Sequence, residues 1–272
     1  MRFVRGITIA VFIGAVILWG VGKIYTLKQD KQAPVIQSEN DEIHVQAGCD
    51  ESEFMKGLTA TDNVDGDLTK EIIVGSISPF IEKGVSTIEY LVFDQSNNVG
   101  RYERTVYFDD YRSPKLVLTE PLMYKQNTEI VLSDRLFAID SLDGDISSKI
   151  RLSTPGVSQS ETGIYEINVE VKNSYGDLVK ESLLLNIIPY QNDQGHIKLK
   201  EYLIYVSKDT EIFPMTYIDK VVDSDGHVLS EEDVSVSMEV DISKTGTGQI
   251  RYELTDPYGN RAVTYMAVIV TE

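Results

Sequence analysis

The sequence predicts an all-β protein in which three tandem β-sandwiches follow one N-terminal transmembrane helix. The main observation is an internal repeat. Three glycines each stand ten residues before a turn-forming residue, in the pairs Gly84 and Asp94, Gly163 and Asn173, and Gly246 and Asp256. Successive copies lie about 80 residues apart, which is just long enough for a domain to bury its own core. The second observation is an uncharged apolar segment at residues 6–22.

The N-terminal segment has the composition of a membrane-spanning helix. Nine of the 17 residues from 6 to 22 are Ile, Leu, Val or Phe, and we expect the helix to span residues 6–25. Arg2 and Arg5 precede it, so residues 1–5 are expected to form a short cytoplasmic tail. A cleaved signal peptide is the alternative. The following Lys23-Ile24-Tyr25 does not resemble a cleavage site with small residues, which favours an uncleaved signal anchor.

Composition narrows the class of protein. The chain of 272 residues is 42% hydrophobic and 25% charged, as in ordinary globular proteins. Its net charge of −18 disfavours nucleic acid and anionic lipid surfaces and makes small cations suitable partners. Cys49 is the only cysteine, so no intrachain disulfide can form. This indicates a prokaryotic envelope protein rather than a disulfide-bonded secreted module, with Cys49 as a packing residue.

Each copy of the repeat has the alternation of a half-buried strand. Apolar residues stand six, four and two positions before the turn-forming residue, as in Ile88, Tyr90 and Val92 of the first copy. The other two sets are Ile167, Val169 and Val171, and Ile250, Tyr252 and Leu254. A second strand is expected after each turn, over residues 100–108, 178–188 and 261–270. We therefore expect every repeat to close with a β-hairpin.

The predicted domains follow from these copies. A linker at residues 26–33 leads into domains at 34–110, 113–189 and 190–272, the last of which is divergent. The joints between the domains are short, which indicates a semi-rigid string rather than flexibly linked domains.

The motifs of the first copy resemble those of a known domain family. Gly57-Leu-Thr-Ala-Thr-Asp-Asn-Val-Asp-Gly-Asp-Leu-Thr69, followed by Gly84 and Tyr90-Leu-Val-Phe-Asp94, resembles the bacterial immunoglobulin-like (Ig-like) family named after a pesticidal crystal protein. This family is common on surface proteins of Gram-positive bacteria. The chain departs from its pattern at Asn97, where the family has Gly, and at Asn173, where it has Asp. The third copy keeps Asp256-Pro-Tyr-Gly-Asn260 but has a degraded acidic turn, Asp223-Ser-Asp-Gly-His227.

The resemblance implies three tandem Ig-like β-sandwiches of seven strands each, placed outside the cytoplasm. It implies no catalytic activity, and a fold alone does not define a function.

Two acidic turns are the candidate metal sites. Ca²⁺ prefers several oxygen ligands, often from closely spaced carboxylates in a loop. Such carboxylates are Asp62, Asp65 and Asp67 of the first copy and Asp140, Asp143 and Asp145 of the second. In an Ig-like sandwich the closing turn lies at the same end, so Asp94 is expected near the first group. The alternative is an Asx turn, in which these side chains accept backbone N–H groups. In the third copy His227 replaces the last Asp.

We do not expect an enzyme. His44, His196 and His227 lack the spacing of metal ligands, and the sequence has no nucleophile elbow and no phosphate-binding glycine loop.

The expected function is that of a single-pass membrane protein of a Gram-positive bacterium. Its extracytoplasmic stalk would serve cell-surface binding, adhesion or spacing. The expected partners are the membrane, through residues 6–25, and an unidentified surface protein or cell-wall glycan, without nucleic acid. Residues 190–272 are expected to be the partner-binding end. The alternatives are an accessory subunit of a membrane or envelope complex, in which the helix contacts a partner, and a Ca²⁺-stabilised binding module.

Overall fold

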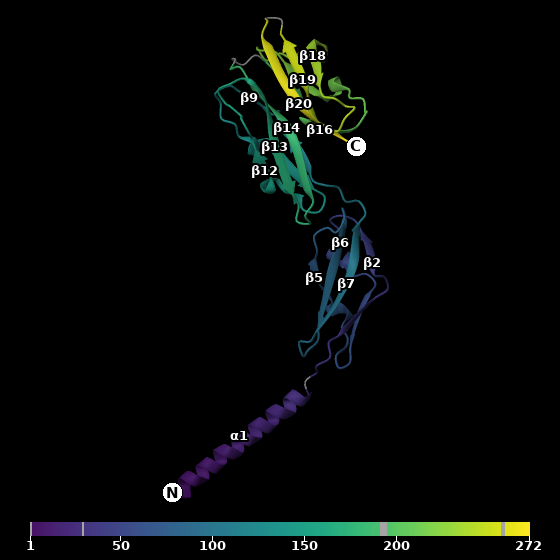
Figure 1. Ribbon diagram of the computed structural model, residues 1–272, viewed down its shortest axis with the longest axis vertical. Helices are drawn as coiled ribbons and strands as arrows, with labels where there is room; N and C mark the ends of the chain where they lie inside the picture. The colour runs from purple at the N-terminus through teal and green to yellow at the C-terminus, as the bar shows by residue number, and fades with distance from the viewer. Residues whose placement is uncertain (1, 29, 191–194, 257–258) are drawn as a thin grey trace. The chain divides into compact units, whose positions relative to one another are not determined.

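The computed structural model describes residues 2–28, 30–190, 195–256 and 259–272 (Figure 1). Met1 of the predicted tail, Gln29 of the predicted linker, and Pro257 and Tyr258 of the third closing turn lie outside the described residues. The chain divides into two compact units, Met1–Asp109 and Asp110–Glu272. The second unit contains both the second and the third repeat.

The N-terminal helix α1 spans Arg2–Lys28. Within it, Gly6–Lys23 is long and apolar enough to cross a membrane, although a signal sequence near an N-terminus meets the same criteria. The apolar side chains whose burial the structure describes in this segment are not covered by the protein: Leu18 is 75% exposed and Trp19 is 68% exposed. The predicted apolar helix is therefore present, and its surface is suited to lipid rather than to water.

The rest of the chain is mostly β-strand. The strands of the first repeat are β1 (Val35–Ser38), β2 (Glu42–Val45), β3 (Leu58–Asp62), β4 (Gly66–Asp67), β5 (Ile73–Ile77), β6 (Val85–Phe93) and β7 (Val99–Phe108). Those of the second are β8 (Lys115–Leu118), β9 (Met123–Lys125), β10 (Leu136–Asp140), β11 (Gly144–Asp145), β12 (Arg151–Ser153), β13 (Gly163–Lys172) and β14 (Leu178–Ile188). Those of the third are β15 (His196–Leu199), β16 (Leu203–Ser207), β17 (Ile218–Val222), β18 (Val234–Glu239), β19 (Gly246–Thr255) and β20 (Arg261–Thr271).

Helical turns in the body are short. They are α2 (Glu51–Phe54), η1 (Thr69–Glu71), η2 (Leu132–Asp134), η3 (Ser147–Lys149), η4 (Pro214–Tyr217) and η5 (Glu231–Asp233). The predicted all-β body is thus confirmed.

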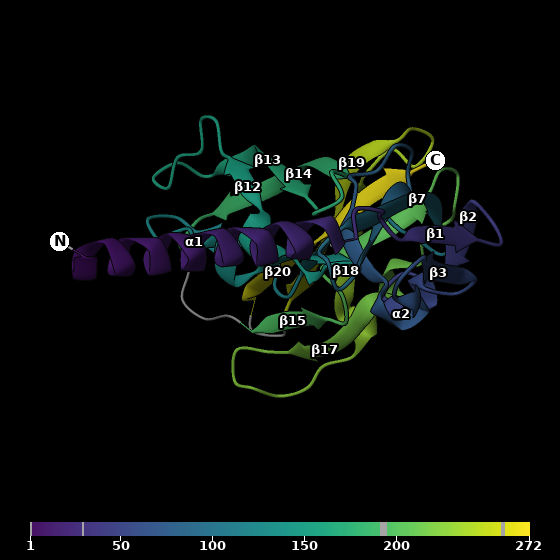
Figure 2. The same ribbon diagram turned by 90° about the horizontal axis from the view of Figure 1, so that it is seen from below.

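The strands of each repeat form two sheets in a similar arrangement, but among the described residues the smaller sheet of the third repeat has two strands where the other two repeats have three. The sheet orders are β1-β3-β4 with β2-β7-β6-β5, then β11-β10-β8 with β12-β13-β14-β9, and then β15-β17 with β16-β20-β19-β18. Figure 2 shows β15 and β17 side by side. In each larger sheet, an early strand pairs in parallel with the last strand of the repeat, and the two long strands form the predicted antiparallel hairpin.

The predicted inward positions of the hairpins form the cores. All nine side chains are at most 1% exposed: Ile88, Tyr90, Val92, Ile167, Val169, Val171, Ile250, Tyr252 and Leu254. The two core tyrosines need a partner for the hydroxyl group. Tyr90 donates to the carbonyl of Phe54 at 2.7 Å, and Tyr252 donates to the carbonyl of Pro214 at 3.0 Å.

The second and third repeats share a core. Leu203, Ala267 and Ile269 of the third repeat belong to the same buried cluster as the core of the second. Across this joint Leu116 N donates to the Tyr205 hydroxyl at 2.8 Å. The second unit is therefore one packed body, and a division of the chain into three separate domains stays a prediction.

A buried amide pair also crosses this joint. Asn186 Nδ2 donates to Gln249 Oε1 at 2.8 Å, and Gln249 Nε2 donates back to Asn186 Oδ1 at 3.3 Å. Because both residues are at most 2% exposed, each amide satisfies hydrogen-bonding groups that water cannot reach.

Candidate functional site

The closing turn is built in the same way in all three repeats. In the first, Asp94 directly follows β6, and its Oδ1 accepts a hydrogen bond from Asn98 N at 2.7 Å. The same bond joins Asn173 and Asp177 at 2.9 Å, and Asp256 and Asn260 at 2.8 Å. This explains why the residue ten positions after each glycine is Asp or Asn: a short side-chain acceptor closes the turn.

The acidic turn after the second strand of the smaller sheet is an Asx turn. Asp62 Oδ1 accepts hydrogen bonds from Val64 N at 2.8 Å and Asp65 N at 2.9 Å. These backbone donors, first that of Asp65, lower the pKa of the Asp62 carboxyl. Asp140 Oδ1 accepts the equivalent two bonds, both at 2.9 Å. In both acidic turns, one oxygen of the first Asp therefore has the role expected in an Asx turn, which was the alternative to a Ca²⁺ site.

The second Asp of each acidic turn joins it to the closing turn. Asp65 Oδ2 accepts from Gln95 N at 2.8 Å. Asp143 accepts from Ser174 N at 2.7 Å and from Ser174 Oγ at 2.6 Å. The two turns therefore lie at the same end of the repeat, as expected from the sequence.

The third Asp of each acidic turn accepts hydrogen bonds from the first residue of the short helix that follows. Asp67 Oδ1 accepts from Thr69 N, and Asp145 Oδ1 accepts from Ser147 N, both at 2.9 Å. In both cases a hydrogen bond from the neighbouring hydroxyl is the main cause that lowers the pKa of the carboxyl. Each of these oxygens holds the start of η1 or η3.

The first repeat brings three carboxylates together. One oxygen from each of Asp30, Asp62 and Asp94 lies within 4.8 Å of the other two. Asp62 and Asp94 were expected to be neighbours, whereas Asp30 was not in the predicted set. A signal for it was in the sequence: Asp30 stands four residues before Pro34, as Asp110 stands four residues before Pro114.

The polar contacts of this cluster are incomplete. Asn98 Nδ2 donates to the backbone oxygen of Asp30 at 3.1 Å and to Asp94 Oδ2 at 2.5 Å. The Oδ2 atoms of Asp30 and Asp62 are buried and accept no hydrogen bond from the described residues. Asp94 is only 5% exposed.

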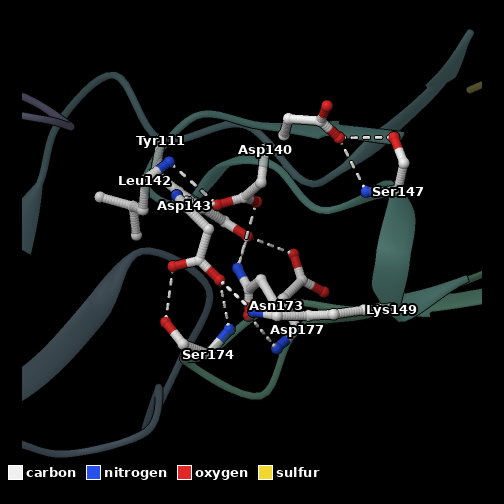
Figure 3. A network of polar contacts seen from close by, with 10 residues as sticks. Tyr111, Asp140, Leu142, Asp143, Ser147, Lys149, Asn173, Ser174 and Asp177 are labelled. Atoms are coloured by element: carbon white, nitrogen blue, oxygen red, sulfur yellow. Dashed lines mark hydrogen bonds and ion pairs between the residues drawn. The ribbon is translucent and has the colours of Figure 1, made fainter. Parts of the chain in front are cut away.

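The second repeat satisfies the equivalent place with neutral groups, as Figure 3 shows. Asn173 Nδ2 donates to Asp140 Oδ2 at 3.2 Å and to the Tyr111 hydroxyl at 2.9 Å. Tyr111 in turn donates to Asp177 Oδ2 at 2.7 Å. Burial, followed by the Asp177 carboxylate, raises the pKa of Tyr111, so the hydroxyl stays a donor.

The third repeat uses a hydroxyl and a histidine. Ser224 Oγ donates to Asp256 Oδ2 at 2.9 Å, and Asn260 Nδ2 donates to Ser224 Oγ at 3.1 Å. His227 Nδ1 lies 3.2 Å from Asp223 Oδ2. Within the described residues, only the first repeat gathers three side chains of the metal-ligating kinds.

Comparisons with known proteins come from the sequence and the fold. No family model matches the chain. Pesticidal crystal protein Cry22Aa from Bacillus thuringiensis is 25% identical over 246 residues, which are 87% of this chain and 33% of the relative. The chain thus spans about a third of that relative's length. This similarity confirms the predicted resemblance to a family named after a pesticidal crystal protein.

Similar solved structures share little sequence with the chain. The M60 catalytic domain with the CBM51-1 and CBM51-2 domains of Clostridium perfringens ZmpB is 13% identical, with a TM-score of 0.24 and coverage of 88% of this chain and 31% of that one. Mouse cadherin-23 EC22-24 is 11% identical, with a TM-score of 0.22 and coverage of 89% and 99%. Drosophila N-cadherin EC1-4 is 11% identical, with a TM-score of 0.22 and coverage of 89% and 76%. TM-scores this low carry no conclusion about function.

Proposed function

We propose that this protein is a single-pass membrane protein of a Gram-positive bacterium, whose β-sandwich body binds a partner outside the cytoplasm without catalysis. The observation that carries the proposal is α1 with its uncovered apolar surface. A contiguous apolar surface of this kind is unfavourable in water and favourable in a bilayer. Asp30 follows two residues after the last residue of the helix, so the body begins close to the membrane.

The proposed orientation follows from charge. Arg2 and Arg5 precede the apolar segment, and positive residues favour the cytoplasmic side. The acidic body is then translocated, because long segments cross the membrane largely regardless of their charge. Binding or spacing is assigned to the body, because the β-strand repeats lie there.

Two clefts lie at the joint between the second and third repeats, and we assign partner binding to them. One is lined by charged and aromatic residues of β19 and β20, among them Arg251, Glu253 and Tyr265. The other is lined in part by Tyr202, Lys125 and His196. Aromatic faces and charged groups of this kind suit a cell-wall glycan or a segment of a surface protein.

The shared core changes how the distal repeat has to be tested. Deletion of residues 190–272 would remove Leu203, Ala267 and Ile269 from the core of the second repeat. A loss of binding in that deletion would report misfolding as well as a lost site. Single surface substitutions avoid this because they leave the core in place.

A suitable substitution is Tyr190→Ala. The Tyr190 side chain is 66% exposed, and the Lys125 ammonium group lies 5.7 Å from its ring centroid. Phe93→Ala is the matched control, because Phe93 is an aromatic residue of the first repeat with 45% exposure.

The experiment is a pull-down with the full chain in nanodiscs against purified cell walls and against solubilised surface proteins. We expect one fraction to be retained, with binding weakened about ten-fold or more by Tyr190→Ala, as for an aromatic hot spot, and unchanged by Phe93→Ala. Retention of neither fraction would contradict the proposed function. If both variants bind the retained fraction equally well, the binding site does not lie at this joint.

A second proposed function is that of an accessory subunit that uses the helix as its interface. A Cβ atom added to Gly6, Gly14 or Gly20 would meet no other atom within 4 Å, so these positions leave flat sites on the helix surface. Replacement of residues 6–25 by an unrelated spanning helix separates the two proposals. If partner binding is retained, the result supports binding by the β-sandwich body. If partner binding is lost while membrane insertion is normal, the result supports an accessory subunit that binds through its helix.

A further inference from the structure

We propose that Asp30, Asp62 and Asp94 bind one divalent cation, for which Ca²⁺ is the best match, and that this cation fixes the membrane-proximal end of the first repeat. The proximity of the three oxygens, within 4.8 Å of one another, is the first observation. Hard cations of this type are bound by several carboxylate and carbonyl oxygens at about 2.3–2.6 Å in typical sites.

The second observation is independent of the clustering. The Oδ2 atoms of Asp30 and Asp62 are closed off from solvent and accept no hydrogen bond within the described residues. A buried carboxylate oxygen without a donor is strongly unfavourable, because it has lost its water and gained nothing in return. None of the three carboxylates forms an ion pair with a described Lys, Arg or His. A cation supplies the missing positive charge to all three at once.

The other two repeats are internal controls for this assignment. The same place holds the Asn173 amide and Tyr111 hydroxyl in the second repeat, and the Ser224 hydroxyl in the third. In the second repeat the Asn173 amide reaches Asp140 Oδ2, the equivalent of Asp62 Oδ2. In the third repeat His227 Nδ1 lies 3.2 Å from the equivalent Asp223 Oδ2, and the Ser224 hydroxyl donates to Asp256 Oδ2, the equivalent of Asp94 Oδ2. A protein group therefore meets this oxygen in the second and third repeats, and within the described residues only the first repeat gathers three carboxylates.

The sources of the ligands give the cation a structural role. Asp30 comes from the linker, Asp62 from the end of β3, and Asp94 from the turn after β6. The linker already lies against the hairpin, since Asn98 Nδ2 donates to the backbone oxygen of Asp30 at 3.1 Å, and Pro34, the residue after the linker, has its carbonyl oxygen 2.1 Å from where a Cβ atom on Gly100 would be. A bound cation would join the linker to both turns and hold the segment between the membrane helix and β1.

The expected affinity is modest. Three carboxylates leave several of the six to eight positions around Ca²⁺ to water or to backbone oxygens. Sites of this kind in extracellular modules bind with a Kd of about 10⁻⁴ to 10⁻³ M. Mg²⁺ demands a near-ideal octahedron and gives up water reluctantly, so we expect it to bind more weakly.

The test is calorimetric titration of the full chain in detergent micelles, freed of metal, with CaCl₂ and separately with MgCl₂. Asp62→Asn and Asp30→Asn remove one charge each, and the amide oxygen introduced by Asp62→Asn can still accept the backbone bonds of the Asx turn. Asp140→Asn is the matched control in the second repeat. We expect one Ca²⁺ site in the native chain, weakened about ten-fold or more by either variant and unchanged by the control.

Thermal melting separates a metal site from a merely structural one. Each metal-free variant serves as its own baseline, because Asp62→Asn weakens the charge-assisted bonds of the Asx turn while it removes one of three neighbouring like charges. Addition of Ca²⁺ should raise the melting temperature of the native chain and of Asp140→Asn, but not that of Asp62→Asn.

Trypsin adds a readout for the linker, because Lys31 is exposed. Ca²⁺ should slow cleavage after Lys31 in the native chain and leave Asp30→Asn unaffected. Three results would overturn the proposal: no binding of Ca²⁺ by the native chain, several weak sites that both variants leave intact, or equal affinity for Mg²⁺. The second result would reflect general attraction of cations to the acidic body.

Discussion

Substitution of Tyr205 by Phe tests whether the second and third repeats form one packed body. The Tyr205 hydroxyl accepts the hydrogen bond of Leu116 N at 2.8 Å, and Leu116 is 2% exposed. Phe keeps the ring, including its contact with the Lys115 ammonium group at 5.0 Å from the ring centroid. The substitution therefore leaves one buried N–H without an acceptor, which costs about 1–3 kcal/mol of unfolding free energy. For a unit of this size that lowers the melting temperature by about 2–12 °C.

The assay is differential scanning calorimetry of the full chain. We expect the unit Asp110–Glu272 to unfold in one transition that Tyr205→Phe shifts down as a whole. Tyr165→Phe is the matched control, because its hydroxyl donates to the Glu161 carbonyl at 3.0 Å in an exposed setting, and a surface change shifts stability by about 0.5 kcal/mol or less. Two separate transitions for this unit, or equal shifts in the two variants, would show that the second and third repeats do not unfold as one packed body.

Three further predictions concern single positions. Gly100→Ala should destabilise the first repeat by about 1–3 kcal/mol, because the added Cβ would overlap the Pro34 carbonyl oxygen. The lower melting temperature can be measured by circular dichroism. Asn97 has a φ of 64°, so Asn97→Val should destabilise the closing turn by about 1–2 kcal/mol while Asn97→Gly should be close to neutral in urea unfolding. Burial raises the pKa of Tyr205 from 10.0 to about 12. The stability that the neutral hydroxyl contributes is therefore complete below about pH 10 and is lost as the pH rises to about 12. Urea unfolding across this range should show a smaller loss of unfolding free energy in Tyr205→Phe than in the native chain.

Much of the architecture was readable from local patterns. Alternation in the long strands identified the inward side chains, because successive residues of a strand face opposite sides of the sheet. The recurring Asp or Asn marked the closing turns, because a short acceptor side chain is required there. Asn97 shows why one departure from the family pattern is harmless: Asn tolerates the positive φ that Gly adopts at Gly176 and Gly259.

The shared core and the third carboxylate were harder to predict because both depend on contacts between distant segments. In β20 the run from Met266 to Val270 is buried on both faces. Such a run signals a second packing layer, yet alternation alone does not say what covers the outer face. Asp30 lies in a linker with no periodicity, and only its spacing to Pro34 connects it to the repeat. Its place beside Asp62 is fixed by how the linker packs against the hairpin.

Protease accessibility on intact cells tests the central claim most directly, namely that α1 holds the body in the membrane from outside the cytoplasm. Trypsin would be added to cells that produce the protein with an epitope at the C-terminus. We expect the epitope to be lost from intact cells, and the untreated chain to sediment with membranes and still begin with residues 1–22. An epitope that is protected until the cells are lysed, or a mature chain that lacks residues 1–22, would contradict an uncleaved anchor with its body outside the cytoplasm.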